Sequence, residues 1–552
     1  MTDQIGSEVT MRGGGMRSRL VSIALLILFG VIAVKGATVA LSETGQTGGV
    51  STAFAEAPQR ADIVDRNGEL LATSVTVYSL FADPRAMMDG ALVARELAAV
   101  LPDIDVETIT KRLENKERAF VWIQRGLTPR QRQAVFELGL EGTGFRKETR
   151  RSYPRGTLAG HALGYTGVDG NGLGGLELSM EDRLAEGGRP LALTIDSNVQ
   201  FSLEAELSDA AGLYGAEGAA GVIMHASTGE VLGIASWPPI NPNRATATAK
   251  DAAERLDRAS GAVYELGSVF KPLTVAGAID SGAIRPSDTF DVRDPLVIRG
   301  RRISDDHPIA GRASVTDIVS KSSNIGTVKV AWQMGARRQQ DLFSNLGLLD
   351  RAPIELTSSQ RPILPTNFDD LNSAVTSYGH GIAVTPVAFT AAFAALANAG
   401  EYNDPSLILS PNKAPSPRRV LSATTANLVT HMMREAVVTG TGKQAEVAGY
   451  RVAGKTGTAE KPIKGGYSDT DNICSFAALF PADSPEYVVM IMLDNPKAGT
   501  GRGRTAAWNA APTAGRVIER IAPILGVKPR FDTLPQTGPV VRSVSERRRS
   551  DL

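Results

Sequence analysis

Ser268 and Lys271 stand three positions apart, just before an apolar run from Leu273 to Ile279. Side chains at this spacing lie on one face of a helix, so the hydroxyl and the amine can meet. Since Gly267 precedes them, we expect Ser268 in the first helical turn, where free backbone N–H groups favour developing negative charge. A desolvated lysine can act as the base that activates a serine. On its own, however, Ser-x-x-Lys is a weak indication, because it occurs by chance in many proteins as a surface serine one turn from a solvated lysine.

Two further motifs support the catalytic interpretation. A Ser-x-Asn motif occupies Ser322–Asn324, and a Lys-Thr-Gly-Thr motif occupies Lys455–Thr458. Ser-x-x-Lys, Ser-x-Asn and Lys-Thr-Gly in this order are typical of penicillin-binding proteins and serine β-lactamases. The three motifs together span well over a hundred residues, which makes their ordered occurrence a strong indication of a serine acyl-enzyme.

Length and composition narrow the class of protein. A chain of 552 residues is too long for one ordinary core, so two or three domains are expected. Lys plus Arg equals Asp plus Glu at 59 each, which gives no indication of nucleic-acid binding. The one cysteine, Cys474, excludes a disulfide framework, and the five histidines show no metal-binding spacing. We therefore expect neither a metal ion nor another cofactor.

The N-terminal region has the pattern of a membrane anchor. Residues 1–19 contain three arginines, and residues 20–41 are almost entirely apolar. About 20 apolar residues cross a bilayer, and preceding basic residues hold the N-terminus in the cytoplasm. Ala-x-Ala patterns at 53–57 raise the alternative of a cleaved signal peptide, but they lie far beyond the apolar run. We predict a single-pass cytoplasmic-membrane protein whose remaining chain lies outside the cytoplasm.

The rest of the chain predicts an α+β fold in two parts. Residues 42–190 are expected to form a linker and a non-catalytic pedestal domain, in which 103–140 is charged and helical in pattern. Residues 191–527 are expected to form the catalytic domain, and the Ser/Arg-rich tail at 528–552 is expected to be disordered. The catalytic part shows a hairpin, then helices, then more strands, which favours an antiparallel sheet flanked by helices. Its predicted strands are 221–224, 231–236, 450–455, 473–480 and 487–493, and a helix is predicted at 506–525.

At this point the chain resembles the class B penicillin-binding proteins, and among them the division-specific, FtsI-type branch (penicillin-binding protein 3 type). The resemblance extends from Arg60 to about Leu525 and rests on the three motifs and on Ser377–Gly381. Three N-terminal segments are similar to pedestal motifs of that class, namely Arg60–Gly68, Arg151–Gly156 and Gly175–Glu177. Two residues depart from the pattern, because Leu266 replaces a usual proline and Ala61 replaces a usual glycine.

The resemblance implies a peptidoglycan D,D-transpeptidase that cross-links stem peptides during septal cell-wall synthesis. Its substrate would be the pentapeptide stem of lipid II-derived glycan strands, which ends in D-Ala-D-Ala, and β-lactams would be covalent inhibitors. A membrane polymerase of the FtsW type and other divisome proteins would be partners at the division septum.

The resemblance also implies roles for individual residues. Ser268 would be the nucleophile and Lys271 its base. Ser322 would relay a proton to the departing amine, and Asn324 would hold the stem's backbone amide and orient Lys271. The third motif would bind the terminal carboxylate and the substrate backbone through Lys455, Thr456, Gly457 and Thr458.

The sequence leaves other functions open. A serine β-lactamase would need a deacylating base, and none is visible in the chain. A D,D-carboxypeptidase, an elongation-specific class B transpeptidase and a β-lactam-binding scaffold or sensor share the same motifs.

Overall fold

The computed structural model describes residues 59–244, 252–410, 416–463, 465–497 and 503–531, together with residues 27 and 30. The predicted cytoplasmic tail, nearly all of the predicted anchor and most of the predicted C-terminal tail lie outside the described residues. Among the described residues, no helix has the length and apolarity needed to cross a membrane. The fold discussed below belongs to the compact unit that begins at Gln59.

The N-terminal part is built on a long strand, β2, which pairs with two others. Strand β2 (Leu70–Ala82) pairs antiparallel with β3 (Val121–Leu127) and with β4 (Thr143–Ser152). The N-terminal end of β2 also pairs with β1 (Ile63–Val64). Strand β1 in turn runs parallel to β5 (Leu191–Ala192). The sheet therefore ties the start of the described chain to the segment that leads into the catalytic part.

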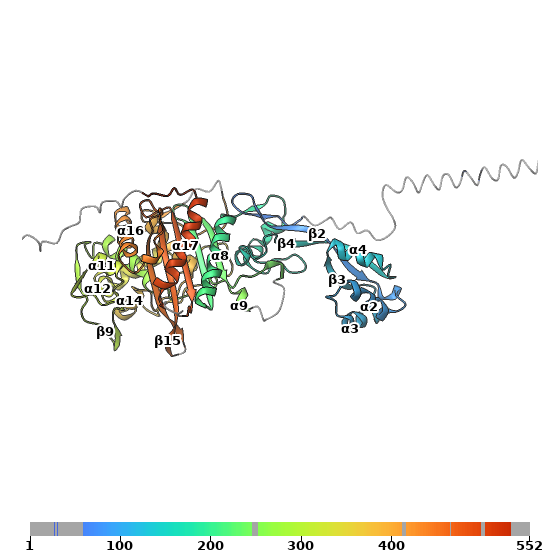
Figure 1. Cartoon of the computed structure of the whole chain (residues 1–552), viewed down its shortest axis with the longest axis horizontal. Coiled ribbons are helices and arrows are strands. Elements are labelled where there is room, and N and C mark those ends of the chain that lie inside the picture. Colours follow the sequence, from blue (N-terminus) through green and yellow to red (C-terminus); the bar gives the residue numbers. More distant parts are fainter. Residues whose placement is uncertain are drawn as a thin grey trace, which may run out of the picture. The chain divides into compact units, whose positions relative to one another are not determined.

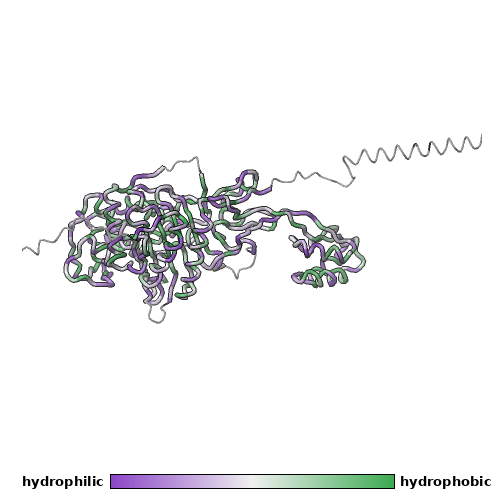
Figure 2. Tube along the Cα trace, turned by 45° about the horizontal axis from the view of Figure 1, so that its top comes forward, coloured by the Kyte–Doolittle hydropathy of each residue, from purple (hydrophilic) through white to green (hydrophobic). Residues whose placement is uncertain are grey.

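Three helices cover this sheet and give it a core of its own. They are α2 (Gly90–Val100), α3 (Val106–Glu114) and α4 (Pro129–Glu137). Leu80, Leu97 and Leu113 are fully buried between the helices and the strands. Figure 2 shows hydrophobic segments in this lobe as well as around the large sheet. The remaining short helices of this part are η1 (Pro84–Ala86), α5 (Gly160–Leu163), α6 (Gly175–Ser179) and α7 (Glu181–Ala185).

The prediction for residues 103–140 was wrong in part, because a strand interrupts the helices. Val121, Ile123 and Leu127 alternate with less buried residues along β3, which is the period of a half-buried strand. The charged helices on either side conceal this short pattern in the sequence.

The C-terminal part is organised around a five-stranded antiparallel sheet, as predicted. The strand order is β14-β15-β16-β6-β7. The strands are β6 (Gly218–His225), β7 (Val231–Trp237), β14 (Ala453–Ile463), β15 (Gly466–Phe480) and β16 (Tyr487–Asp494). Strands β14 and β15 form one hairpin that is longer than the sequence predicted.

Helices pack on both faces of this sheet. Side chains alternate along β16, so Val488, Met490 and Met492 enter one buried cluster while Val489, Ile491 and Leu493 enter another. The first cluster includes α15 (Pro386–Ala397), and the second includes α8 (Ser197–Tyr214) and α17 (Ala510–Ile524). Helices α8 and α17 contact each other beside the sheet (Figure 1). Because both faces of the sheet are buried, the sequences of these strands are continuously apolar and do not alternate with polar residues.

The remaining elements lie between β7 and β14 or near the C-terminus. The helices are η2 (Pro242–Arg244), α9 (Ala252–Arg255), η4 (Gly267–Phe270), α10 (Lys271–Asp280), α11 (Val315–Ser320), α12 (Asn324–Met334), α13 (Ala336–Asn345), α14 (Asp370–Thr376), α16 (Ala423–Val438), η5 (Lys443–Ala445) and η6 (Ala506–Trp508). Short antiparallel pairs are β8 (Thr289–Asp291) with β11 (Arg312–Ser314), β9 (Leu296–Ile298) with β10 (Arg301–Ile303), and β12 (Glu401–Tyr402) with β13 (Arg418–Arg419).

Candidate active site

Ser268 lies in the turn η4, directly before Lys271 begins helix α10. Gly267 has a φ of +64°, and a Cβ at this position would come within 2.9 Å of the carbonyl oxygen of Thr458. The turn therefore needs glycine for both its backbone conformation and its close approach to β14. Within the described part of the chain, Oγ of Ser268 makes no hydrogen bond, so it is free to meet a substrate.

The third motif fits against this turn from the other side. Gly457 on β14 faces the carbonyl oxygen of Leu266, which a Cβ would approach to 2.2 Å. Ser475 on β15 donates a hydrogen bond of 2.8 Å to the same carbonyl. The departure at Leu266 therefore leaves the turn anchored, with the leucine side chain fully buried.

Ser322 joins the first and third motifs. Its Oγ accepts hydrogen bonds from Nζ of Lys271 at 3.1 Å and from Nζ of Lys455 at 2.9 Å. Lys271 also donates to the carbonyl oxygen of Ser322. Ser322 has a φ of +65°, a conformation that a non-glycine residue adopts at a cost of about 1–3 kcal/mol. The surrounding contacts hold it there, and they place one hydroxyl between two amines.

Burial changes the acid–base properties of both lysines. Burial lowers the pKa of Lys271 to about 7, although the charges of Asp305 and Asp306 oppose this shift. Burial also holds the pKa of Lys455 well below its ordinary value, and the charge of Lys271 acts in the same direction. A lysine with a pKa near 7 is partly a neutral amine at physiological pH, which is the form that can accept the proton of a serine.

Among the described residues, no hydrogen bond joins Asn324 to Lys271. Its side-chain amide donates a hydrogen bond of 2.8 Å to the carbonyl oxygen of Ser304 instead. The amide thus lies against the segment that follows β10, and the predicted orientation of Lys271 by Asn324 stays a prediction.

Asp305 is a residue of this site that the sequence did not indicate. Its carboxylate accepts a hydrogen bond from Oγ of Ser323 at 2.7 Å and another from the backbone N–H of Ile325 at 2.9 Å. Ser323 in turn caps helix α12. Asp305 therefore fixes the turn that carries Ser322. It stands 18 residues from Ser323, at a spacing that matches no short motif.

The two threonines of the third motif both have partners within the protein. Oγ1 of Thr456 lies 2.7 Å from Oγ1 of Thr441, and Oγ1 of Thr458 accepts a hydrogen bond of 3.1 Å from the N–H of Ala506. Thr441 belongs to a Gly-Thr-Gly turn after α16, which the sequence did not connect with the site. Both hydroxyls retain further hydrogen-bonding capacity toward a ligand.

The Ser377–Gly381 loop packs on the turn η4, which carries Ser268. A Cβ at Gly379 would come within 2.2 Å of the carbonyl oxygen of Gly267, so glycine is required. Burial lowers the pKa of His380 to about 4, with the charges of Arg301 and Lys271 adding to the effect. A histidine that is neutral over the physiological range agrees with a structural role for this loop.

Two parts of the chain match known protein families. The family described as "Penicillin binding protein transpeptidase domain" matches residues 219–517, and "Penicillin-binding Protein dimerisation domain" matches residues 55–186. The chain is 41% identical to the probable peptidoglycan D,D-transpeptidase FtsI of Caulobacter vibrioides, over 90% of this chain and 86% of that protein. It is 29% identical to the peptidoglycan D,D-transpeptidase FtsI of Escherichia coli K12, over 85% of this chain and 84% of that protein.

The fold is similar to a solved penicillin-binding protein. The crystal structure of penicillin-binding protein 3 from Mycobacterium tuberculosis in complex with aztreonam matches with a TM-score of 0.66 and 26% identity. The match covers 86% of this chain and 97% of that one. Both the sequence and the fold therefore lead to the same group of proteins.

Proposed function

This chain belongs to the penicillin-binding protein transpeptidase family and is a peptidoglycan D,D-transpeptidase of the division type, and we propose that its acyl-enzyme forms on Ser268. The observation that carries this assignment is the hydrogen-bonded cluster of Lys271, Ser322 and Lys455 beside a serine whose Oγ is free. It supplies a base, a proton relay and a positive charge around one nucleophile.

The positions of Lys271, Ser322 and Lys455 support the following acylation step. The neutral amine of Lys271 accepts the proton of Ser268 as Oγ attacks the carbonyl carbon of the penultimate D-Ala. The backbone N–H groups of Ser268 and Thr458 stabilise the oxyanion, a contribution of about 3–4 kcal/mol for a donor that is removed. The proton then passes from Lys271 through Ser322 to the nitrogen of the terminal D-Ala, which leaves as a free amino acid.

Transfer to the acceptor is the reverse sequence with a different amine. The amine of a neighbouring stem attacks the ester, its proton returns through Ser322 and Lys271, and Oγ of Ser268 leaves with a proton. One amide bond is broken and one is formed, so no oxidant, metal ion or nucleotide is needed. A β-lactam enters the same first step, and its opened ring remains bound as an ester on the serine.

The third motif holds the donor stem. The negative charge of the bound carboxylate would favour the protonated form of Lys455, which would then supply positive charge, with Thr456 and Thr458 as hydroxyl donors. Gly457 lets the substrate backbone approach β14 closely. Asn324 would bind the stem's backbone amide when a substrate replaces its contact with Ser304.

The cellular setting is also part of the proposal. Residues 20–41 would anchor the chain in the cytoplasmic membrane, with the catalytic part outside at the division septum. A membrane polymerase of the FtsW type and other divisome proteins would be its partners. The FtsI names of the two relatives support this setting.

A replacement experiment tests the proposal. The native protein is depleted, and Ser268→Ala is supplied at normal abundance in the membrane, as checked by blot. We expect loss of labelling by a fluorescent penicillin and failure to divide. Retained penicillin labelling would rule out Ser268 as the acylation site. Normal division without labelling would show that the protein acts as a scaffold.

A further inference from the structure

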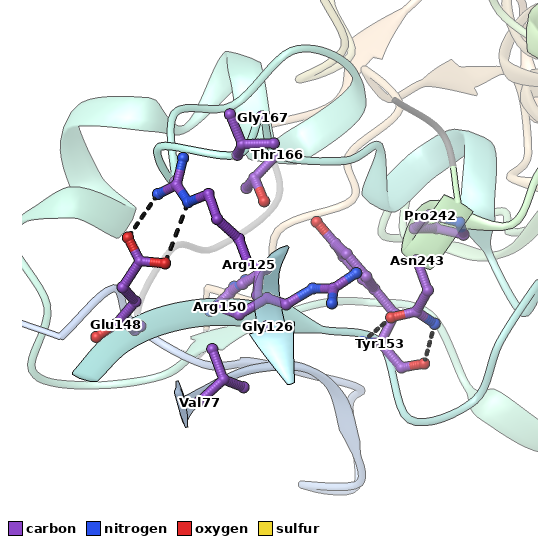
Figure 3. A pocket seen from close by; sticks show the side chains of 14 residues that line it. Val77, Arg125, Gly126, Glu148, Arg150, Tyr153, Thr166, Gly167, Pro242 and Asn243 are labelled. Carbon is purple, nitrogen blue, oxygen red and sulfur yellow. Dashed lines mark hydrogen bonds and ion pairs between the residues drawn. The ribbon is translucent and has the colours of Figure 1, made fainter. Parts of the chain in front are cut away.

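A cavity of about 170 Å³ lies in the N-terminal part, among strands β2, β3 and β4 (Figure 3). Its lining comes from residues 77–170 and from Pro242 and Asn243, so it shares no residue with the Ser268 cleft. Asn243 closes one side, because its side-chain amide exchanges two hydrogen bonds, of 3.0 and 2.9 Å, with the backbone of Tyr153. The cavity therefore touches both the pedestal sheet and the segment that follows β7.

Three arginines line the cavity, and their charges are unequally compensated. Arg125 is paired with Glu148 at 2.8 Å, as Figure 3 shows, and with Asp169 at 3.2 Å. Arg150, on β4, forms no ion pair or hydrogen bond with the part of the chain that the structure describes. Its guanidinium lies against Gly126, where a Cβ would come within 2.8 Å of Nη1. Positive charge is thus left over at the mouth of the cavity.

Arg151 leaves a donor without a partner inside the molecule. Its side chain is only 2% exposed, and its Nε donates to Glu177 at 2.7 Å. Its Nη1 lies near two oxygens, whereas its buried Nη2 has no hydrogen-bond partner among the described residues. A buried charged donor is normally satisfied, because leaving it unpaired costs the full loss of its hydration. Nη2 is enclosed by the protein, so Arg151 adds uncompensated donor capacity and positive charge behind the cavity wall, and the cavity itself is larger than one water molecule needs.

We propose that this cavity binds a carboxylate carried on a side chain of an acidic peptide segment. The guanidinium of Arg150 would donate from the mouth in a geometry that matches the planar shape of a carboxylate, and the positive charge of Arg151 would attract the same group through the cavity wall. The carboxylate of Glu148 lines the same cavity, and it repels a doubly charged phosphate more strongly than a singly charged carboxylate. The cavity also shares Arg150 and Arg151 with an adjoining groove of about 700 Å³, which gives the peptide backbone a place to lie.

Ligand-observed NMR with a matched pair of small probes tests the proposal. The probes are N-acetyl-glutamate methylamide and N-acetyl-glutamine methylamide, which differ only in the charge of the side chain. The purified full-length protein is first acylated with a penicillin, so that the carboxylate site beside Lys455 is occupied. We expect saturation transfer to the glutamate probe at least about fivefold greater than to the glutamine probe, since charge-assisted pairing is lost with the neutral amide.

Two arginine variants locate the binding. Arg150→Gln should reduce the glutamate signal to the level of the glutamine probe. Arg146→Gln removes an exposed arginine on the same strand, outside the cavity, and should leave the signal unchanged. Unaltered penicillin acylation of both variants shows that they are folded and keeps this test separate from the assignment of Ser268.

Three results would overturn the proposal. Equal signals from the two probes would show that charge is not recognised. An unchanged glutamate signal in Arg150→Gln would place the binding elsewhere. Displacement of the glutamate probe by methylphosphonate at equal concentration and ionic strength would identify a phosphate site instead.

Discussion

Two clusters of buried charge in this molecule are built in opposite ways. In the N-terminal part, Glu177 is fully buried and receives Arg60 at 2.6 Å and Arg151 at 2.7 Å, so opposite charges neutralise each other. In the cleft, Lys271 and Lys455 are equally buried, yet in the described structure neither forms an ion pair and both donate to Ser322. Paired charges keep their ionised forms, whereas unpaired buried amines lose their protons more easily. The first arrangement stabilises the ionised side chains of a fold, and the second lowers the pKa of an amine, as the proposed role of Lys271 requires.

The largest effect is expected from Lys271→Met. Without its base, Ser268 should be acylated by a fluorescent penicillin about 10²–10⁴ times more slowly. The free energy of unfolding should be unchanged or higher, because the buried amine no longer has to be desolvated. The matched control is Lys321→Met, which removes an exposed lysine next to the second motif and should alter neither measurement.

The sign of the stability effect follows from the pKa of Lys271. That pKa is about 7 in the folded chain and 10.5 ordinarily, so the unfolded chain binds more protons between these values. The cost of burying Lys271 is therefore greatest below pH 7 and disappears as the pH approaches 10.5. A loss of stability in Lys271→Met at pH 7 would contradict this account of the cleft.

Glu177→Gln should have the opposite profile. Two buried guanidinium groups would lose their counter-charge, which lowers the free energy of unfolding by about 3–5 kcal/mol in urea titrations. The molecules that remain folded should be acylated at the normal rate. Glu69→Gln breaks an exposed ion pair with Arg155 and should cost less than about 1 kcal/mol. If Glu177→Gln and Glu69→Gln lowered the free energy of unfolding by similar amounts, the buried cluster around Glu177 would contribute no more to stability than the exposed pair of Glu69 and Arg155.

The smallest effect is expected from Asp306→Asn. The acylation rate should rise with pH through the pKa of Lys271 and become constant above it, since only the neutral amine accepts a proton. Asp306 is exposed, and its charge raises the pKa of Lys271. Its removal should therefore move the rising limb to lower pH by a fraction of a unit, because solvent screens the interaction. Asp341→Asn, on the exposed face of α13, should leave the profile in place, and an upward shift in Asp306→Asn would contradict the assignment of this limb.

The sequence predicted those parts of the site that depend on local spacing. Ser268 and Lys271 stand three residues apart where η4 leads into α10, so a common helical face for them could be predicted from spacing alone. The apolar runs at 487–493 and 473–480 also predicted central strands correctly, because burial on both faces leaves a continuous hydrophobic signal. The same reasoning failed at β3, where a seven-residue strand lies between charged helices.

Contacts between distant segments could not be predicted in this way. Asp305 reaches Ser323 because the chain after β10 folds back onto α12, and Asn324 turns toward Ser304 in the same arrangement. The cavity beside Arg150 and Arg151 likewise needs Asn243, which lies 90 residues from Tyr153. No local periodicity encodes these separations.

The sequence by itself determined the family and the order of the three motifs, and it predicted Ser268 as the nucleophile, since each of these depends on a few neighbouring residues. The tertiary structure decided which of those residues form hydrogen bonds with one another. It alone places Ser322 in a left-handed conformation between two buried lysines, and burial rather than residue type brings the pKa of Lys271 to about 7. Desolvation depends on everything that surrounds a side chain, and that environment exists only once the chain has folded.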